Sequence, residues 1–257
     1  MKRALWALPL PILLVLAWSF AVEQRWFTLI PPPLEVVRAI VDFTFGSLND
    51  DAYSGTLVTH LLASTGRVFG GFAIATVTGV PLGILLARFD RLSSLVEPTL
   101  GLLRPIPVTA WVPLVLIVFG LGTQSAVILI FIGSFFPILI NTMAGVKRVP
   151  KRLIEAAAML GTSDREMLYK VVLPAAVPSV FAGMRIALGL AWVVVVVGET
   201  VGVPTGLGSV ITEAREVSRT EIIITGMLFI GLTGLASDKL MTWLIRRALG
   251  NRPLLST

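Results

Sequence analysis

The sequence predicts an all-α protein that crosses a lipid bilayer several times. The chain has 257 residues, of which 55% are hydrophobic and only 14% charged, and its mean hydropathy is +0.89. This composition is too apolar for an ordinary soluble domain. The apolar residues form stretches about as long as the roughly 20 residues that span a bilayer as a helix. One long polar segment, residues 147–178, interrupts them. We therefore expect six transmembrane helices, with this segment between the fourth and the fifth.

We expect the whole chain, residues 1–257, to form a single transmembrane domain. Residues 1–55 would supply the first span and an amphipathic segment on the outer side. Residues 56–250 would form the core, with the polar loop 147–178 inside it.

The first span is expected at residues 4–22, directly after Lys2 and Arg3. A cleaved signal peptide is the alternative, because it also begins with positive charge followed by an apolar run. The run is longer than the usual apolar region of a signal peptide, and no small-x-small cleavage site follows it before Glu23. We therefore favour a retained span.

Residues 31–53 begin with three prolines and continue with apolar residues at helical spacing, namely Leu34, Val37, Ile40 and Val41. An amphipathic helix of this kind can lie on the membrane surface. It can equally be an ordered segment that packs on its own protein. The sequence leaves both interpretations open.

Residues 57–87 form the second expected span and are rich in glycine and alanine. Small residues three or four positions apart let transmembrane helices approach closely, so this span is expected inside the bundle. Residues 106–146 are too long for one crossing and are broken at 120–124, which predicts a hairpin of two spans. The fifth and sixth spans are expected at 175–198 and 222–245, separated by a polar, glycine-broken stretch at 201–221.

The first arm of the expected hairpin contains Pro105, Pro107 and Pro113 and so cannot be a straight helix. Irregular backbone at membrane depth is stable only where protein or a water-filled path receives its polar groups. These prolines either line a conduit or form a kink that fits neighbouring helices, and the sequence does not separate the two.

The polar segment 147–178 is predicted to form two short helices joined by a tight break. Pro150 is tolerated at the first turn of a helix, and good helix formers follow it. Gly161 supplies the left-handed position that commonly ends a helix. Ser163 and Glu166 have the spacing of a capping box, which predicts a second helix that runs toward Leu173 and ends at the prolines beyond it.

The first of these short helices has a shallow face, formed by Ala156, Ala157, Ala158 and Gly161. Such a face lets a partner's backbone or side chains approach closely. It indicates a docking surface rather than a catalytic one.

The distribution of positive charge orients the chain. With the N-terminus inside, thirteen of the 21 Lys and Arg residues fall on the same side as the segment 147–178, and only four fall on the opposite side. Positively charged loops remain in the cytoplasm, so we expect this segment and both termini there. This asymmetry explains the net charge of +6. The sequence contains no basic patch interleaved with aromatic residues, which would indicate binding to nucleic acid.

The sequence predicts no catalytic residues, no metal site and no cofactor in this chain. It contains no cysteine and a single histidine, His60, which excludes thiolate and multi-histidine metal centres. No Gly-Lys pair occurs, so the glycine-rich phosphate loop of an ATPase is absent. The energy for any transport must therefore come from a partner.

A few polar and aromatic side chains near the spans have two possible roles. Glu199 ends a valine run and either belongs to an outer gate or faces water at the interface, and we favour water. Arg185 and Arg104 either hold an inner gate or extend to the surface, and we favour the surface for Arg185. Trp111 and Trp192 are more typical of packing or of the membrane interface than of ligand contact.

The segment 147–178 carries a known signature. Glu155-Ala156-Ala157, then Gly161, then Leu173-Pro174 resembles the EAA signature of permease subunits in bacterial ABC importers of the type I fold. Val171 stands where that signature usually has isoleucine. Residues 56–239 are similar to the nitrate, sulfonate and taurine branch, through stretches that begin at Arg67, Gly79, Glu97, Arg104 and Gly183.

The resemblance implies a function and a set of partners. The EAA segment would be a cytoplasmic coupling helix between the fourth and fifth spans, held in a cleft of an ABC subunit that binds ATP and Mg. A periplasmic binding protein would deliver the solute, and a second permease copy or a related chain would complete the path in the bacterial inner membrane. The coupling residues would be Glu155, Ala156, Ala157, Ala158, Gly161, Leu173 and Pro174, and the candidates for the path or gate are Arg104, Pro105, Pro107, Trp111, Pro113, Arg185, Trp192 and Glu199.

The solute implied by the resemblance is a small oxyanion such as nitrate, bicarbonate, a sulfonate or taurine, or another small organic compound. An ion-coupled secondary transporter is the first rival, but the inverted repeats and mid-membrane charges expected of it are not evident. A membrane scaffold is the second rival. Co-purification of a nucleotide-binding subunit distinguishes the ABC permease from both.

Overall fold

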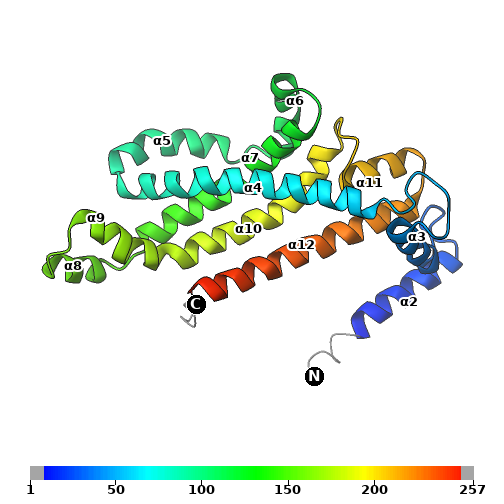
Figure 1. Cartoon of the computed structure of the whole chain (residues 1–257), viewed down its shortest axis with the longest axis horizontal. Coiled ribbons are helices and arrows are strands. Elements are labelled where there is room, and N and C mark those ends of the chain that lie inside the picture. The colour runs from blue at the N-terminus through cyan, green and yellow to red at the C-terminus, as the bar shows by residue number, and fades with distance from the viewer. Residues whose placement is uncertain (1–8, 250–257) are drawn as a thin grey trace. The chain divides into compact units, whose positions relative to one another are not determined.

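A computed structural model describes residues 9–249, and within that range every regular element is a helix (Figure 1). The chain forms two compact units. Among the described residues, unit 1 consists of residues 9–64 together with Pro204–Gly231, and unit 2 of Thr65–Val203 together with residues 232–249. The single domain expected from the sequence stays a prediction.

The helices are α2 (Pro9–Glu23), α3 (Pro33–Phe45), α4 (Leu57–Arg88), α5 (Asp90–Leu103), α6 (Val108–Phe119), α7 (Thr123–Lys147), α8 (Lys151–Met159), α9 (Asp164–Glu166), the π-helix η1 (Met167–Val172), α10 (Leu173–Glu199), α11 (Leu207–Glu216) and α12 (Thr220–Leu249).

Four helical stretches among the described residues are long and apolar enough to cross a membrane: Leu57–Arg88, Thr123–Lys147, Asp164–Glu199 and Thr220–Arg247. They coincide with the expected second, fourth, fifth and sixth spans. The expected third span is broken, because α6 has only 12 residues and meets α5 at 98°. Counting this bent pair as one span gives five. The expected first span begins outside the described residues, and its described part, α2, has 15 residues.

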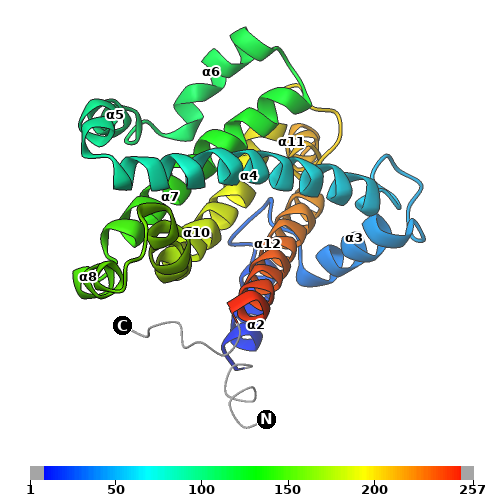
Figure 2. The same cartoon turned by 60° about the vertical axis from the view of Figure 1, so that its left-hand side comes forward.

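In unit 2, α7 packs against both α4 and α10 at glycines (Figures 1 and 2). A Cβ atom added to Gly71 of α4 would lie 2.7 Å from Ile130 of α7. A Cβ atom added to Gly183 of α10 would lie 2.5 Å from the Cβ of Asn141, also on α7. Because real Cβ atoms do not approach so closely, these helices are in backbone-level contact. The close packing expected for the span 57–87 is thereby confirmed.

Unit 1 has its own small core between α3 and α11. Phe43 of α3 is fully buried, as are Leu207 and Val210 of α11. The sequence does not predict α11, because 201–221 is a polar stretch broken by glycines. The described structure supports the interpretation that α3 packs on its own protein, but the buried face differs from the expected one, because Leu34 and Val37 are exposed. Membrane contact through that exposed face stays a prediction.

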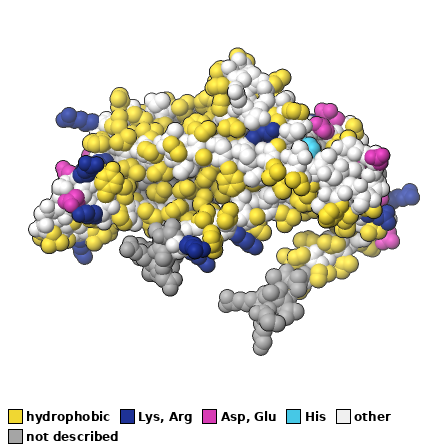
Figure 3. All heavy atoms as spheres, viewed as in Figure 1, with side chains coloured by type: hydrophobic (Ala, Val, Ile, Leu, Met, Phe, Trp, Pro, Cys, Tyr) yellow, Lys and Arg dark blue, Asp and Glu magenta, His cyan; other side chains and the backbone are white. Residues whose placement is uncertain are grey.

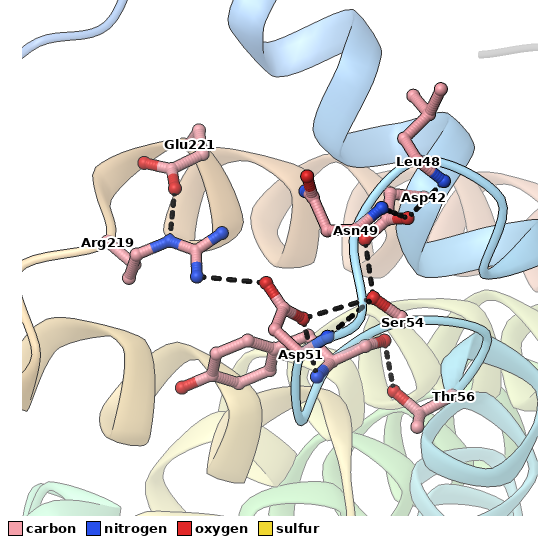
Figure 4. A network of polar contacts seen from close by, with 9 residues as sticks. Asp42, Leu48, Asn49, Asp51, Ser54, Thr56, Arg219 and Glu221 are labelled. Carbon is pink, nitrogen blue, oxygen red and sulfur yellow. Dashed lines mark hydrogen bonds and ion pairs between the residues drawn. The ribbon is translucent and has the colours of Figure 1, made fainter.

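A polar network fixes the loop between α3 and α4 (Figure 4). Asp42 accepts hydrogen bonds from the backbone N–H groups of Leu48 and Asn49, at 2.9 and 2.8 Å, and from the Ser54 hydroxyl at 2.7 Å. The Ser54 hydrogen bond, followed by those from the backbone, lowers the pKa of Asp42 below its ordinary value. One buried carboxylate therefore organises the start and the end of the loop.

The same loop is tied to the start of α12. Arg219 donates to Asp51 at 3.0 Å and also to Glu221. Burial alone would raise the pKa of Asp51, but hydrogen bonds from the Tyr53 N–H and from Arg219 outweigh it, and the net shift is downward. Arg219 is thus held between two carboxylates (Figure 4).

The surface of unit 2 is that of a membrane protein. Hydrophobic side chains cover the face over α4 and α10, and Lys and Arg side chains gather at the end that carries α5, α8 and α9 (Figure 3). Large apolar residues such as Val77 and Val193, with 72% and 64% exposure, face outward from the spans. Exposed apolar area on this scale indicates contact with lipid or with another chain.

Candidate functional site

The polar segment between α7 and α10 folds into an elbow made of α8, α9 and η1. Pro150 stands at the N-cap of α8. At the other end, the Gly161 N–H donates to the Ala158 carbonyl at 3.0 Å, and the Thr162 N–H donates to the Ala157 carbonyl at 3.2 Å. Gly161 has a φ of +79°, so this is a Schellman motif with glycine at the left-handed position. The predicted helix end at Gly161 is confirmed.

The elbow has a small core of its own. Val149, Met167 and Val172 are buried together, and Ile154 and Ala157 of α8 pack against them. Ala157 therefore belongs to the inner side of α8, whereas Glu155, Ala156 and Ala158 are exposed. The alanine face inferred from the sequence is thus divided between a packing side and an outer side.

Two large apolar side chains are almost fully exposed at the tip of the elbow. Met159 is 87% exposed and Leu160 is 86% exposed, directly before the left-handed Gly161. They adjoin the exposed Ala156 and Ala158. The elbow is already closed around its own core, so these residues contribute nothing to it, and the exposed face is open to a partner.

The second half of the elbow begins at the predicted capping box. The Glu166 N–H donates to the Ser163 hydroxyl at 3.4 Å, and the Ser163 N–H donates to the Glu166 carboxylate at 3.3 Å. The capping box is confirmed, but the expected end of this helix at the prolines after Leu173 is wrong. The helix continues through η1 into α10, and Pro174 lies in the first turn of α10. A proline is tolerated there because the chain changes from π-helical to α-helical hydrogen bonding at that point.

Three of the path candidates share a pocket of about 450 Å³ in unit 2. Arg104, Pro105 and Pro107 form the break between α5 and α6, and they line this pocket together with side chains of α7 and α10. The expected departure from a straight helix at these prolines is confirmed by the 98° bend. Pro113 instead lies within α6, and Trp111 is half-buried on the same helix.

Two other path candidates bind α10 to α12. Trp192 is buried, donates to the Ser237 hydroxyl at 3.2 Å and packs against Gly234. This geometry agrees with the packing role favoured for Trp192. Arg185 forms a bidentate ion pair with Asp238, in which Nη2 and Oδ2 lie 2.7 Å apart. The sequence alone does not predict this partner for Arg185.

Glu199 does not face water, so the interpretation that we favoured for it is wrong. Its side chain is fully buried and lies 2.6 Å from Nη1 of Arg67, which is itself only 6% exposed. Arg67 also donates to the Thr123 hydroxyl at 3.3 Å. The pair joins α4, the start of α7 and the end of α10. Arg67 was not among the expected site residues, although a cation was needed if Glu199 was to be buried.

The described residues combine interhelical packing with two surface features, an apolar tip and a pocket. In residues 9–249 no group of three or more His, Cys, Asp or Glu side chains is placed to hold a metal ion. The features present are an elbow with an exposed apolar tip, a pocket at a helix break and a set of interhelical ion pairs. They characterise a polytopic α-helical membrane component.

The comparisons with known proteins assign this component to a family. The chain belongs to the binding-protein-dependent transport system inner membrane components, a family that matches residues 79–250. A protein of Methanocaldococcus jannaschii, provisionally named as an ABC transporter permease, is 41% identical over 93% of this chain and 88% of its own length.

Two further relatives define the branch. A bicarbonate transport system permease of Synechococcus elongatus is 36% identical over 87% of this chain and 82% of its own length. A taurine transport system permease of Escherichia coli is 34% identical over 87% of this chain and 80% of its own length. The resemblance to an ABC permease of this branch is therefore confirmed.

A solved structure shares the fold. One chain of an inward-facing methionine ABC transporter matches with a TM-score of 0.60 and 21% identity, covering 75% of this chain and 99% of that one. At this identity the likeness concerns the fold alone.

Proposed function

We propose that this chain is the transmembrane subunit of an ATP-driven importer, and that its α8–α9 elbow docks on a separate ATP-hydrolysing subunit. The solute is a small oxyanion such as bicarbonate, nitrate, a sulfonate or taurine, delivered by a periplasmic binding protein. The relatives named for bicarbonate and taurine support this class of solute. A second copy of the chain, or a related chain, completes the path.

The observation that carries the proposal is the exposed tip of the elbow. Met159 and Leu160 are almost fully exposed on a segment that also holds exposed Lys151, Arg152 and Arg165. A charged, water-compatible segment has no reason to display two large apolar side chains unless a partner covers them. The small outer residues Ala156 and Ala158 would let that partner approach the backbone of α8.

The mechanism follows from how the elbow is connected. Because the helix runs without a break from α9 through η1 into α10, a push on the elbow moves the near end of α10 directly. α10 is packed at backbone level on α7 and bound to α12 through Arg185 and Asp238, so the displacement reaches both. Closure of the ATP-hydrolysing subunits would in this way change the bundle between inward-open and outward-open states.

The remaining features of the proposal concern topology. Six spans place the elbow, Arg246 and Arg247 in the cytoplasm of a bacterium, with both termini on that side of the inner membrane. The charge asymmetry of the sequence supports this orientation. ATP and Mg would be bound by the partner, and this chain would hold no cofactor.

The test replaces a small exposed residue of α8 with a large one. Ala156→Trp alters only the outer surface of α8, so the variant should insert into the membrane normally. The ATP-hydrolysing subunit should no longer co-purify with it, and the rate of solute uptake should fall at least tenfold. Ala52→Trp, at an exposed alanine of the loop between α3 and α4, is the matched control and should behave as the wild type. Normal co-purification with Ala156→Trp would overturn the proposed docking site.

A further inference from the structure

The side chains that line the pocket at the break between α5 and α6 carry positive charge and no negative charge. Thirteen residues line it, and Arg104 is the only charged one among them. Arg104 forms no ion pair with any of residues 9–249, whereas Arg67, Arg185 and Arg219 each have a carboxylate partner. The guanidinium of Arg104 therefore has no carboxylate partner among residues 9–249.

The backbone at the start of α6 adds to the positive electrostatic potential of the pocket. Pro107 is the N-cap of α6 and lines the pocket beside Val108, the first residue of that helix, and none of the described side chains caps this end. The first amide groups of a helix carry partial positive charge and bind anions. The helix start by itself would not define a site, but it lines the same pocket as Arg104, which has no ion-pair partner in the part of the chain that the structure describes.

One neutral polar side chain completes the lining. Asn141 of α7 donates one N–H of its amide to the Pro137 carbonyl at 2.8 Å, which fixes the amide and leaves its second N–H available. Gly183 of α10 packs directly on the Cβ of Asn141 and holds it in place. An anion in the pocket can thus be bound by a guanidinium and by a fixed amide.

The remaining walls are apolar. Ile132, Phe136 and Leu190 line the pocket, which has a volume of about 450 Å³. Pockets of about 300–1,000 Å³ hold small organic ligands. A bare inorganic anion would leave these walls without contact, whereas an anion with a short apolar tail would cover them.

We propose that the pocket between α5, α6, α7 and α10 binds small organic monoanions, such as alkanesulfonates, through Arg104 and Asn141, and that it is a binding site for the solute within the permease itself. The inference rests on the proposed function and narrows its solute to the organic members of the oxyanion class. Recognition of the solute would then not be confined to the binding protein.

Binding is tested on the full chain in phosphatidylcholine nanodiscs by calorimetric titration with butanesulfonate. The wild type should bind butanesulfonate more tightly than nitrate and should not bind butylammonium. Arg104→Gln and Asn141→Asp should each weaken butanesulfonate binding at least tenfold, the first by removing the cation and the second by adding a repelling carboxylate. Arg91→Gln, at an exposed arginine outside the pocket, should bind as the wild type does.

Several outcomes would overturn the site. They are absence of butanesulfonate binding by the wild type, unchanged binding by a correctly folded Arg104→Gln variant, or equal binding of butylammonium. Displacement of butanesulfonate by phosphatidylglycerol added to the nanodiscs would assign the pocket to a lipid headgroup and would also overturn it. Co-purification of the ATP-hydrolysing subunit is measured separately with the same variants, so loss of the site and loss of the docking proposal remain distinguishable.

Discussion

The ion pair between Arg67 and Glu199 explains how a carboxylate can end a run of valines without reaching water. Burying an isolated ionised carboxylate is very costly, but a guanidinium 2.6 Å away and further hydrogen bonds offset that cost. Each charge is therefore tolerated only because the other is present.

Removing one member of this pair is expected to destabilise the protein strongly. Glu199→Gln leaves Arg67 charged and buried without its counter-ion, so the free energy of unfolding in detergent should fall by about 3–5 kcal/mol. The double variant Arg67→Met/Glu199→Met removes both charges and should recover most of this loss.

The control for this prediction is an exposed pair of the same type. Lys170 and Glu166 lie 2.6 Å apart on the surface of the elbow. Lys170→Met should change the free energy of unfolding by no more than about 1 kcal/mol, because exposed ion pairs contribute little. A Glu199→Gln variant as stable as Lys170→Met would show that the buried pair is energetically unimportant.

At the scale of elements, the contact between α7 and α10 depends on glycine at particular positions. A Cβ atom at Gly183 would lie 2.5 Å from the Cβ of Asn141 and 2.9 Å from the Pro137 carbonyl oxygen, which belongs to the backbone of α7 and cannot move aside. At Gly189, on the same helix, nothing lies within 4 Å of the added atom.

These two glycines give a matched pair of substitutions. Gly183→Ala should lower the free energy of unfolding by about 1–3 kcal/mol through overpacking. Gly189→Ala should raise it by about 0.5–1 kcal/mol, because alanine is the better helix former and has room. Thermal unfolding of both variants in one detergent measures the difference, and equal midpoints would refute the close contact between α7 and α10.

The sequence predicts the elements of this fold better than their contacts. Hydropathy and length locate α4, α7, α10 and α12, because a membrane span must be long and apolar whatever surrounds it. Gly161 and Ser163 mark the helix ends in the elbow, because capping is a local effect. α11 was missed, since its buried face of Leu207 and Val210 acquires meaning only when α3 packs on it.

In the candidate site, too, local features can be predicted from the sequence and tertiary contacts cannot. The elbow could be recognised from local residues, and the bend at Pro105 and Pro107 from the prolines alone. That Arg67 lies against Glu199, 132 positions further along the chain, and that Asn141 shares a pocket with Arg104, depends on tertiary packing. The continuation past Pro174 was also unpredictable, because it depends on a π-helical turn that no single residue specifies.

At the scale of the whole molecule, the proposed function requires the elbow and the loop between α3 and α4 to lie on opposite sides of the membrane. Positive residues are concentrated on the side of the elbow, whereas the segment around the other loop contains Asp42, Asp50 and Asp51. This asymmetry is typical of a cytoplasmic elbow and an external loop.

The absence of cysteine from the chain makes the orientation directly measurable. Asp50→Cys and Arg165→Cys each place one thiol at an exposed position, in the loop between α3 and α4 and in the elbow respectively. In intact spheroplasts a membrane-impermeant maleimide should label Asp50→Cys fully. It should label Arg165→Cys only after the membrane has been permeabilised. Labelling of Arg165→Cys in intact spheroplasts would place the elbow outside the cell, where ATP-hydrolysing subunits cannot reach it, and the coupling role of Met159 and Leu160 would then have to be abandoned.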